Sequence, residues 1–249
     1  FGLTGLPPKP QEVATFVARW EQAPQAAIGQ LADRLLASPD FGVRWARHWL
    51  DTVRYADYLR ADPFGVNKQL QYELYEAFRY RDWVVDAFNA DLPYDNFIRH
   101  QIAGDLLPNP NGAAIYPEGL IATTVLAFGF WENGCADKKK VVSDIVDDQI
   151  DVVGKAFLGL TLACARCHDH KFDPLTQDDY YGLAGIFYSS RILQSVGTKG
   201  GHTILLRTSL EPPKYLERRQ QALAEVGAID KKISQVKSRL PVPVKMLAW

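Results

Sequence analysis

The pentad Cys164-Ala165-Arg166-Cys167-His168 constrains this chain more than any other stretch. Thiols at positions i and i+3 can form thioether bonds to the two vinyl groups of one porphyrin, and the imidazole that follows directly can bind the iron. The pentad therefore predicts one covalently bound haem c. Cys164 and Cys167 would attach it, and His168 would be the proximal iron ligand.

Two other kinds of site use a Cys-x-x-Cys pair and stay open as alternatives. A structural zinc site could recruit Cys164, Cys167, His168 and His170, although four ligands within seven residues strain a tetrahedral geometry. A thioredoxin-like redox pair should follow a strand of a βαβ unit, whereas the surroundings here look helical. For His170 we expect a cofactor-binding role, through a hydrogen bond to a haem propionate or to the proximal ligand, against a plain surface histidine.

The predicted haem also predicts a compartment. Thioether attachment takes place outside the bacterial cytoplasm, so we expect a periplasmic, extracellular or cell-surface protein. Three cysteines in 249 residues exclude a disulfide scaffold. The third cysteine, Cys135, is then expected to be a small buried hydrophobic residue.

Composition excludes several partners. The net charge of −1 argues against general binding of nucleic acid or anionic membranes. The longest apolar runs, Leu120–Trp131 and Val152–Ala165, are too short or too interrupted for a membrane span. No signal peptide opens the chain at Phe1, which indicates a mature chain or a fragment if the protein is exported.

Hydrophobic periodicity predicts a mainly α fold with a small β element. We expect a multi-helix haem c domain over residues 1–190, a short β or loop connection over 191–212, and a long amphipathic, coiled-coil-like helix and tail over 213–249, leading into a further domain. Within these parts, helices are expected from Pro10, around Ile28–Leu35, at about 41–58, 71–89, 94–107, 117–130 and 141–162, and through Tyr180–Phe187, with a loop at Arg60–Lys68, a strand near Ser195–Thr208 and the long helix at Pro213–Leu240.

The helix expected from Phe41 to Tyr58 carries an unusual polar stripe. Arg44, His48, Asp51 and Tyr55 recur at i, i+4, i+7 and i+11, so they would share one face. Such a stripe is costly to bury without partners, and a haem with charged propionates would supply them. We therefore predict that this face lines the haem pocket.

The same stripe supplies the catalytic candidates. Together with Asp57, its four residues would provide acid/base and charge-stabilising groups. His48 is predicted to be either the sixth iron ligand or the distal acid/base group. The alternative is a core histidine bonded to a carboxylate, beside ordinary helix ion pairs from Arg44 or Arg47 to Asp51. The only methionine, Met246, lies in the terminal tail and is an improbable axial ligand.

Several longer motifs resemble one known family. They are Leu3–Pro8, Arg44–Asp51, Arg54–Asp57, Tyr80–Val84, Ala103–Leu107, Asp147–Asp151 and Ala163–Pro174. Together they resemble the planctomycete- and verrucomicrobium-type cytochrome-c domain, long catalogued only as a domain of unknown function, over roughly residues 1–190. Where relatives have Arg-Glu-Gln, this chain has Arg99-His100-Gln101, so the resemblance assigns no function to His100.

The resemblance implies a large exported protein with a cytochrome module upstream. Relatives are often encoded near polysaccharide-degrading enzymes and sulfatases, which implies carbohydrate-related oxidoreductase chemistry. Our first functional hypothesis is therefore an extracytoplasmic haem-dependent oxidoreductase with an open distal site and a glycan substrate. The alternative is an electron-relay or assembly module whose haem is six-coordinate and which serves a redox partner protein. A third hypothesis is a glycan-binding module in which haem is a structural staple.

Overall fold

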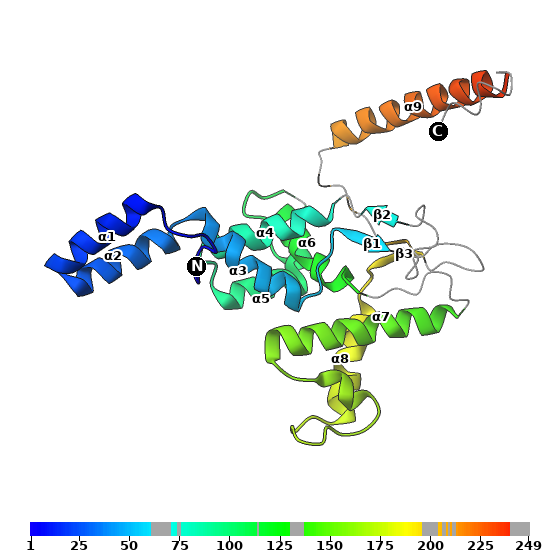
Figure 1. Cartoon of the computed structure of the whole chain (residues 1–249). Coiled ribbons are helices and arrows are strands. Elements are labelled where there is room, and N and C mark those ends of the chain that lie inside the picture. The colour runs from blue at the N-terminus through cyan, green and yellow to red at the C-terminus, as the bar shows by residue number, and fades with distance from the viewer. Residues whose placement is uncertain are drawn as a thin grey trace. The chain divides into compact units, whose positions relative to one another are not determined.

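The computed structural model describes residues 1–60, 71–73, 76–113, 115–129, 137–195, 204–205, 208, 210 and 213–239. The described elements are mainly helical (Figure 1), which confirms the predicted fold class. The chain divides into two compact units, Phe1–Leu206 and Arg207–Trp249, and each is described by itself. None of the helices in the described ranges combines the length and the apolar character that a membrane crossing requires.

The first unit contains eight of the labelled α-helices. They are α1 (Pro10–Gln22), α2 (Pro24–Leu36), α3 (Pro39–Thr52), α4 (Ala77–Asn89), α5 (Tyr94–Ala103), α6 (Pro117–Ala122), α7 (Lys138–Val153) and α8 (Gln177–Ser189). Shorter turns of helix extend or link them: η2 (Gly104–Leu106), η3 (Thr123–Ala127), the π-helical η4 (Gly154–Leu158) and η5 (Leu162–Arg166). Proline occupies the start of α1, α2, α3 and α6, where its missing N–H costs no hydrogen bond.

Two short antiparallel hairpins complete the first unit. Strand β1 (Tyr58–Arg60) pairs with β2 (Gln71–Glu73), and β3 (Leu193–Ser195) pairs with β4 (Ile204–Leu205). The second hairpin confirms the strand expected near Ser195–Thr208. The second unit contains α9 (Pro213–Arg239), which confirms the long helix expected at Pro213–Leu240.

One core of the first unit lies between α3, α4 and α5. Tyr80, Val84 and Val53 are fully buried there. The side-chain amide of Gln101 is a polar group buried within this core. Its Oε1 accepts from the Tyr80 hydroxyl at 2.6 Å and from Trp49 Nε1 at 3.1 Å. Each polar atom in this group has a hydrogen-bond partner, so these hydrogen bonds compensate the cost of removing it from water.

A second core lies between α7, α8 and η5. Its buried members are Val146, Ile150, Leu162, Ala165, Tyr180, Ala184 and Phe187. Two of them, Leu162 and Ala165, belong to the segment that carries the pentad. The candidate attachment site is thus built directly on a hydrophobic core.

The helix predicted from Phe41 to Tyr58 is shorter than expected. It ends at Thr52, because Arg54 adopts a left-handed conformation (φ 61°). The amide of Tyr55 then donates to the Leu50 carbonyl at 2.9 Å and the amide of Arg54 to the Asp51 carbonyl at 3.3 Å, which is the hydrogen-bond pattern of a Schellman motif. Tyr55 therefore lies beyond the helix, and the prediction that it shares the Arg44 face was wrong.

The predicted start of the next helix, at Gln71, was also wrong. Gln71–Glu73 form strand β2, and α4 begins only at Ala77. Of the loop expected at Arg60–Lys68, Arg60 belongs to β1, and the remainder lies outside the described residues. The helices expected at 94–107, 117–130 and 141–162 exist, but each of them changes to 3₁₀ or π geometry before its expected end.

Candidate functional site

The pentad begins in η5 and is anchored by its apolar residues. Leu162 and Ala165 are only 2% and 1% exposed in the second core. Gly154 makes room for this packing, because a Cβ there would lie 2.8 Å from Leu162 Cγ. With Ala165 turned into the core, Cys164 and Cys167 on either side of it are exposed and carry free thiols.

Arg166 holds the middle of the pentad between two helices. Its guanidinium pairs with the Asp147 carboxylate of α7 at 2.9 Å. Its carbonyl accepts from two residues of α8, the Tyr181 hydroxyl at 3.2 Å and Gln177 Nε2 at 3.3 Å. Tyr180 completes the cluster by donating its hydroxyl to Asp147 at 2.7 Å, and burial followed by this carboxylate raises the pKa of Tyr180.

His168 is exposed and oriented by a backbone hydrogen bond. Its Nδ1 lies 2.7 Å from the Asp169 carbonyl oxygen, which can only accept, so Nδ1 carries the proton. In the neutral ring this hydrogen bond selects the tautomer that leaves Nε2 free, which is the nitrogen through which an imidazole can bind a metal. The Asp169 carboxylate accepts in turn from the Gln177 amide at 2.9 Å. Gln177 thus holds the backbone carbonyl of Arg166 before Cys167 and the side chain of Asp169 after His168.

These residues fit a covalently held haem. Two exposed thiols lie on a rigid segment, and an exposed imidazole with its Nε2 in the metal-binding form follows them. Exposed apolar surface belongs to the same region of the chain, since Leu158 is 58%, Phe172 82% and Tyr181 56% exposed. A porphyrin covering such side chains would remove apolar area from water.

His170 holds the following loop in shape. Its Nδ1 accepts from the Asp173 amide at 2.9 Å and from the Phe172 amide at 3.3 Å, and its Nε2 lies 3.0 Å from Thr161 Oγ1. Both ring nitrogens are therefore used within the loop, and the side chain is only 10% exposed. This geometry leaves no nitrogen for the zinc site considered above, and among the described residues no group of three or more His, Cys, Asp or Glu side chains could hold a metal.

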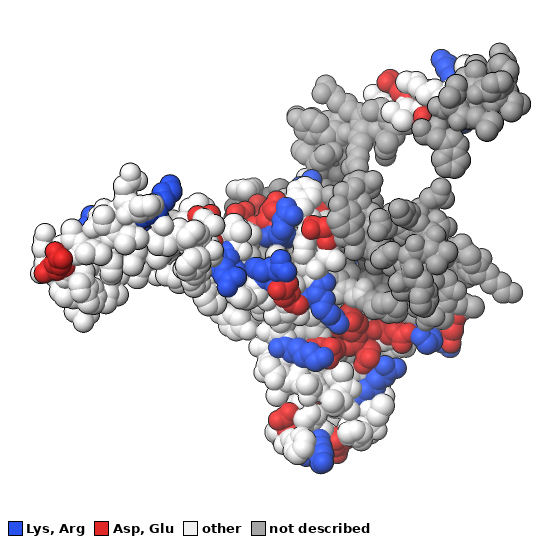
Figure 2. All heavy atoms as spheres, viewed as in Figure 1, with Lys and Arg blue, Asp and Glu red and all other residues white. Residues whose placement is uncertain are grey.

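The acidic residues of α7 are paired with cations. Figure 2 shows acidic side chains gathered along this helix, with Lys and Arg at the border of the patch. Ion pairs join Asp144 to Lys140, Asp147 to Arg166, Asp148 to Arg54, and Asp151 to Lys155. The cluster is thus a network of ion pairs. Burial raises the pKa of Asp148 despite the opposing effect of Arg54.

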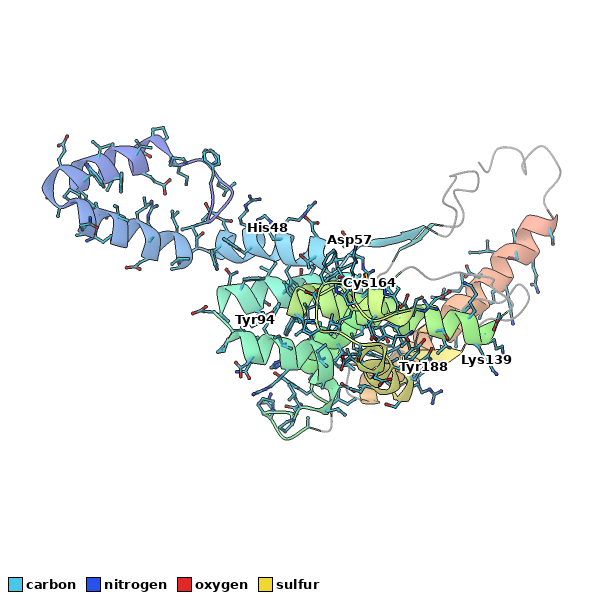
Figure 3. All side chains as sticks on the ribbon, turned by 90° about the horizontal axis from the view of Figure 1, so that it is seen from below. His48, Asp57, Tyr94, Lys139, Cys164 and Tyr188 are labelled. Carbon is cyan, nitrogen blue, oxygen red and sulfur yellow. The ribbon has the colours of Figure 1, made fainter. Side chains whose placement is uncertain are left out.

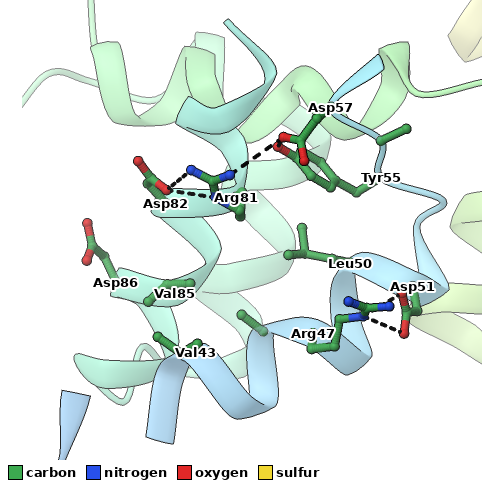
Figure 4. Close-up of a pocket in the computed structure, with 12 residues that line it drawn as sticks. Val43, Arg47, Leu50, Asp51, Tyr55, Asp57, Arg81, Asp82, Val85 and Asp86 are labelled. Atoms are coloured by element: carbon green, nitrogen blue, oxygen red, sulfur yellow. Dashed lines mark hydrogen bonds and ion pairs between the residues drawn. The ribbon is translucent and has the colours of Figure 1, made fainter. Parts of the chain in front are cut away.

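A groove of about 670 Å³ lies between α3 and α4 (Figure 4). Its apolar lining comes from Val43, Ala46 and Leu50 on α3 and from Val85 on α4. Its polar lining comes from Arg47, Asp51, Tyr55, Asp57, Arg81, Asp82 and Asp86. With two arginines and four aspartates in that lining, the groove has an excess of acidic side chains.

Hydrogen bonds and ion pairs order these polar groups. The Tyr55 hydroxyl donates to Asp57 at 2.6 Å, and Arg81 lies 3.6 Å from the same carboxylate while it pairs with Asp82 at 3.0 Å. Burial and then the Asp57 carboxylate raise the pKa of Tyr55, so its phenol stays a proton donor at neutral pH. On the opposite wall, Arg47 and Asp51 form an ion pair at 3.0 Å.

The structure brings together three of the five catalytic candidates. Asp51, Tyr55 and Asp57 line the groove, whereas Arg44 and His48 do not. His48 is exposed on α3 with its ring edge-on to Trp45 at 5.7 Å, so it is not the core histidine of the alternative hypothesis. Figure 3 shows His48 apart from Cys164. A role for His48 as the sixth iron ligand stays a prediction.

Of the two arginines of the groove, Arg47 was expected only in a helix ion pair with Asp51, which the structure confirms, and Arg81 was not singled out from the sequence. Arg81 and Asp82 belong to the motif Tyr80–Val84, which was the only signal that could have indicated them. Arg44 has a different place, because its Cδ would lie 3.3 Å from a Cβ at Gly5, where the backbone is left-handed (φ 73°). It therefore packs beside the amino-terminal segment.

Comparison with known proteins gives one match. The model of the family described as "PSCyt2: Protein of unknown function (DUF1549)" matches residues 1–192. No curated protein and no solved structure matches the chain.

Proposed function

The chain belongs to the PSCyt2 family, and we propose that this member is an extracytoplasmic c-type cytochrome. One haem would be attached through Cys164 and Cys167, with His168 as the proximal iron ligand. The observation that carries the proposal is the geometry of the pentad: two exposed thiols flank a buried alanine, and a hydrogen bond from Nδ1 to the Asp169 carbonyl leaves Nε2 of His168 as the iron-binding nitrogen.

Attachment needs no oxidant. Each thiol adds across one vinyl group, so that sulfur bonds to one vinyl carbon and the thiol hydrogen goes to the other. Arg166 and Gln177 would keep the two cysteines and His168 in place during this reaction, because they tie the segment to α7 and α8. When bound, the haem supplies one-electron chemistry.

We further propose that this chemistry is that of an oxidoreductase, with carbohydrate-related molecules as substrates. The groove between α3 and α4 would bind the substrate, since it combines an apolar floor with hydrogen-bonding groups that are already ordered. There, the Asp51 and Asp57 carboxylates would accept from substrate hydroxyls, and the Tyr55 oxygen, whose proton is donated to Asp57, would be a further acceptor.

The second candidate function is an electron relay for a redox partner protein or an upstream cytochrome module. It is favoured by the exposure of both cysteines and of His168, since a haem held at the surface can exchange electrons with a docked protein. In this case both axial positions of the iron would be filled.

Spectroscopy of the exported protein separates these proposals. We expect a pyridine haemochrome spectrum of a c-type haem from protein produced in a bacterial periplasm with haem-attachment machinery, and no covalent haem in Cys164→Ser/Cys167→Ser. A high-spin ferric EPR signal would indicate an open distal site and support the oxidoreductase. A low-spin signal would support the relay. Wild-type protein without haem would contradict both.

A further inference from the structure

Helix α9 carries an apolar stripe that is exposed to solvent. Val226, Ile229, Ile233 and Val236 are 53%, 54%, 44% and 59% exposed. Every side chain described between residues 224 and 236 is exposed, so the described part of the helix buries none of its hydrophobic residues. Four β-branched side chains in one row are an unusual surface for a protein in water.

The spacing of the stripe identifies the kind of surface it fits. Its members follow one another at intervals of three, four and three residues, which are the a and d positions of a heptad repeat. The sequence continues the same spacing to Ala222 on one side and Leu240 on the other. Between Val226 and Val236 the large apolar residues are confined to a and d, which is the narrow seam of a coiled coil, whereas a helix packed on a globular core needs a wider apolar face. Nearer the amino-terminal end of the helix, the sequence also places Leu216 and Leu223 at position e.

We propose that α9 forms an antiparallel two-stranded coiled coil with α9 of a second copy of this chain, centred on residue 231. In this register Val226 faces Val236 of the second copy, and Ile229 faces Ile233 of the second copy. Each layer thus pairs side chains of equal size. The apolar stripe matches itself without a cavity or a polar residue in the seam.

The flanking charges select this orientation over the parallel one. In a parallel pair, Glu225 at position g would face Asp230 at position e of the second copy, and this like-charge contact would occur twice. In the antiparallel pair, Glu225 instead faces position 239 of the second copy, where the sequence has arginine. Near the axis, Asp230 and Lys232 each meet their own copy, one like-charge contact each, which water and salt screen. A parallel pair would add two contacts between Lys232 and Lys237 of the second copy to the two between Glu225 and Asp230.

The first test is the mass of the full chain in solution. By sedimentation equilibrium we expect a concentration-dependent monomer–dimer equilibrium for the wild type and a monomer for Ile229→Asp/Ile233→Asp. The matched control is Ala224→Asp/Ala228→Asp, which adds the same charges at the same spacing on the outer face and should leave the dimer intact. A monomeric wild type up to several hundred micromolar, or a control that is equally monomeric, would overturn the proposal.

The second test addresses orientation. Glu225→Lys should weaken the antiparallel dimer roughly tenfold, because two attractive contacts become repulsive. Adding Arg239→Glu should restore the affinity. In a parallel pair Glu225→Lys would instead tighten the dimer by meeting Asp230, and that result would refute the proposed orientation. The proposal is independent of haem, so both tests apply equally to protein with and without it.

Discussion

At the scale of single residues, His170 and His48, two histidines with predicted roles at the haem, have different surroundings. His170 is nearly buried and uses both ring nitrogens within its loop, to two backbone amides and to Thr161. His48 lies on the surface of α3 and contacts the ring of Trp45. Both were predicted from the sequence to act at the haem, but only the structure shows that His170 organises the loop that follows the pentad.

This difference predicts opposite outcomes for the two alanine variants. His170→Ala should lower the free energy of unfolding by about 1–2 kcal/mol, because it leaves partly buried amides without an acceptor. His48→Ala should change the same quantity by less than about 0.5 kcal/mol. Denaturant unfolding of both variants measures this, and equal stability losses would contradict the assigned role of His170. If His48→Ala also changes the Soret band of haem-loaded protein, His48 is an iron ligand after all.

At the scale of elements, close packing of backbones fixes the position of α6. Gly104 in η2 and Gly119 in α6 approach so closely that a Cβ on either one would collide with the carbonyl oxygen of the other. Two glycines that contact in this way bring the elements nearer than any other residue pair allows. By contrast, Gly185 on α8 has open space where a Cβ would be.

Gly104→Ala should therefore destabilise the protein by about 2 kcal/mol or more, since the backbones must separate. Gly185→Ala should stabilise it by about 0.5–1 kcal/mol, because alanine in an exposed helix interior loses less conformational entropy than glycine. Thermal unfolding monitored by circular dichroism compares the two variants. A Gly104→Ala protein as stable as the wild type would show that η2 and α6 are not packed as described.

Sequence patterns predicted the elements better than their ends. The long helices and α9 follow from apolar periodicity, which depends on neighbouring residues alone. The end of α3 does not, since the left-handed residue of its Schellman motif is Arg54 rather than glycine, and that conformation is stabilised from afar by ion pairs to Asp148 and Asp151. The hairpin of β1 and β2 interrupts a stretch whose pattern resembles a helix.

For the candidate site, too, the sequence indicated local features but not those that depend on packing between helices. Roles for Cys164, Cys167 and His168 could be proposed from the sequence, because a local motif carries its own chemistry, and those roles stay predictions. The groove could not be predicted, because its walls come from α3 and α4, and Arg81 approaches Asp57 only in the folded chain. The pairs Arg47–Asp51 and Arg81–Asp82 are local and do not reveal the groove. The predicted stripe from Arg44 to Tyr55 required a continuous helix. Because α3 ends at Thr52, Tyr55 does not share the helix face of Arg44.

At the scale of the whole molecule, buried tyrosines link stability to pH. Burial is the main cause that raises the pKa of Tyr55, Tyr80 and Tyr180 above the ordinary value of 10.0. A raised pKa in the folded state means that the native protein keeps protons that the unfolded chain releases. The stabilisation is complete below pH 10 and is lost as the pH rises from there toward the folded-state values.

We therefore expect the free energy of unfolding to fall above about pH 10, by up to about 1.4 kcal/mol per pH unit for the fully buried Tyr80. Tyr80→Phe should lower stability at neutral pH, where the hydrogen bond to Gln101 is lost, and should make the alkaline decline shallower. Urea unfolding between pH 8 and 11 measures both effects. An unchanged slope in Tyr80→Phe would contradict this account of Tyr80.

The central claim is that Cys164 and Cys167 hold one haem, and intact mass spectrometry tests it most directly. Protein exported to a periplasm with haem-attachment machinery should be heavier than its polypeptide by the mass of one haem, and the difference should survive denaturation in acid. Replacement of both cysteines by serine should remove the added mass. A wild-type mass equal to that of the polypeptide alone, under conditions in which a known c-type cytochrome is matured, would contradict the claim.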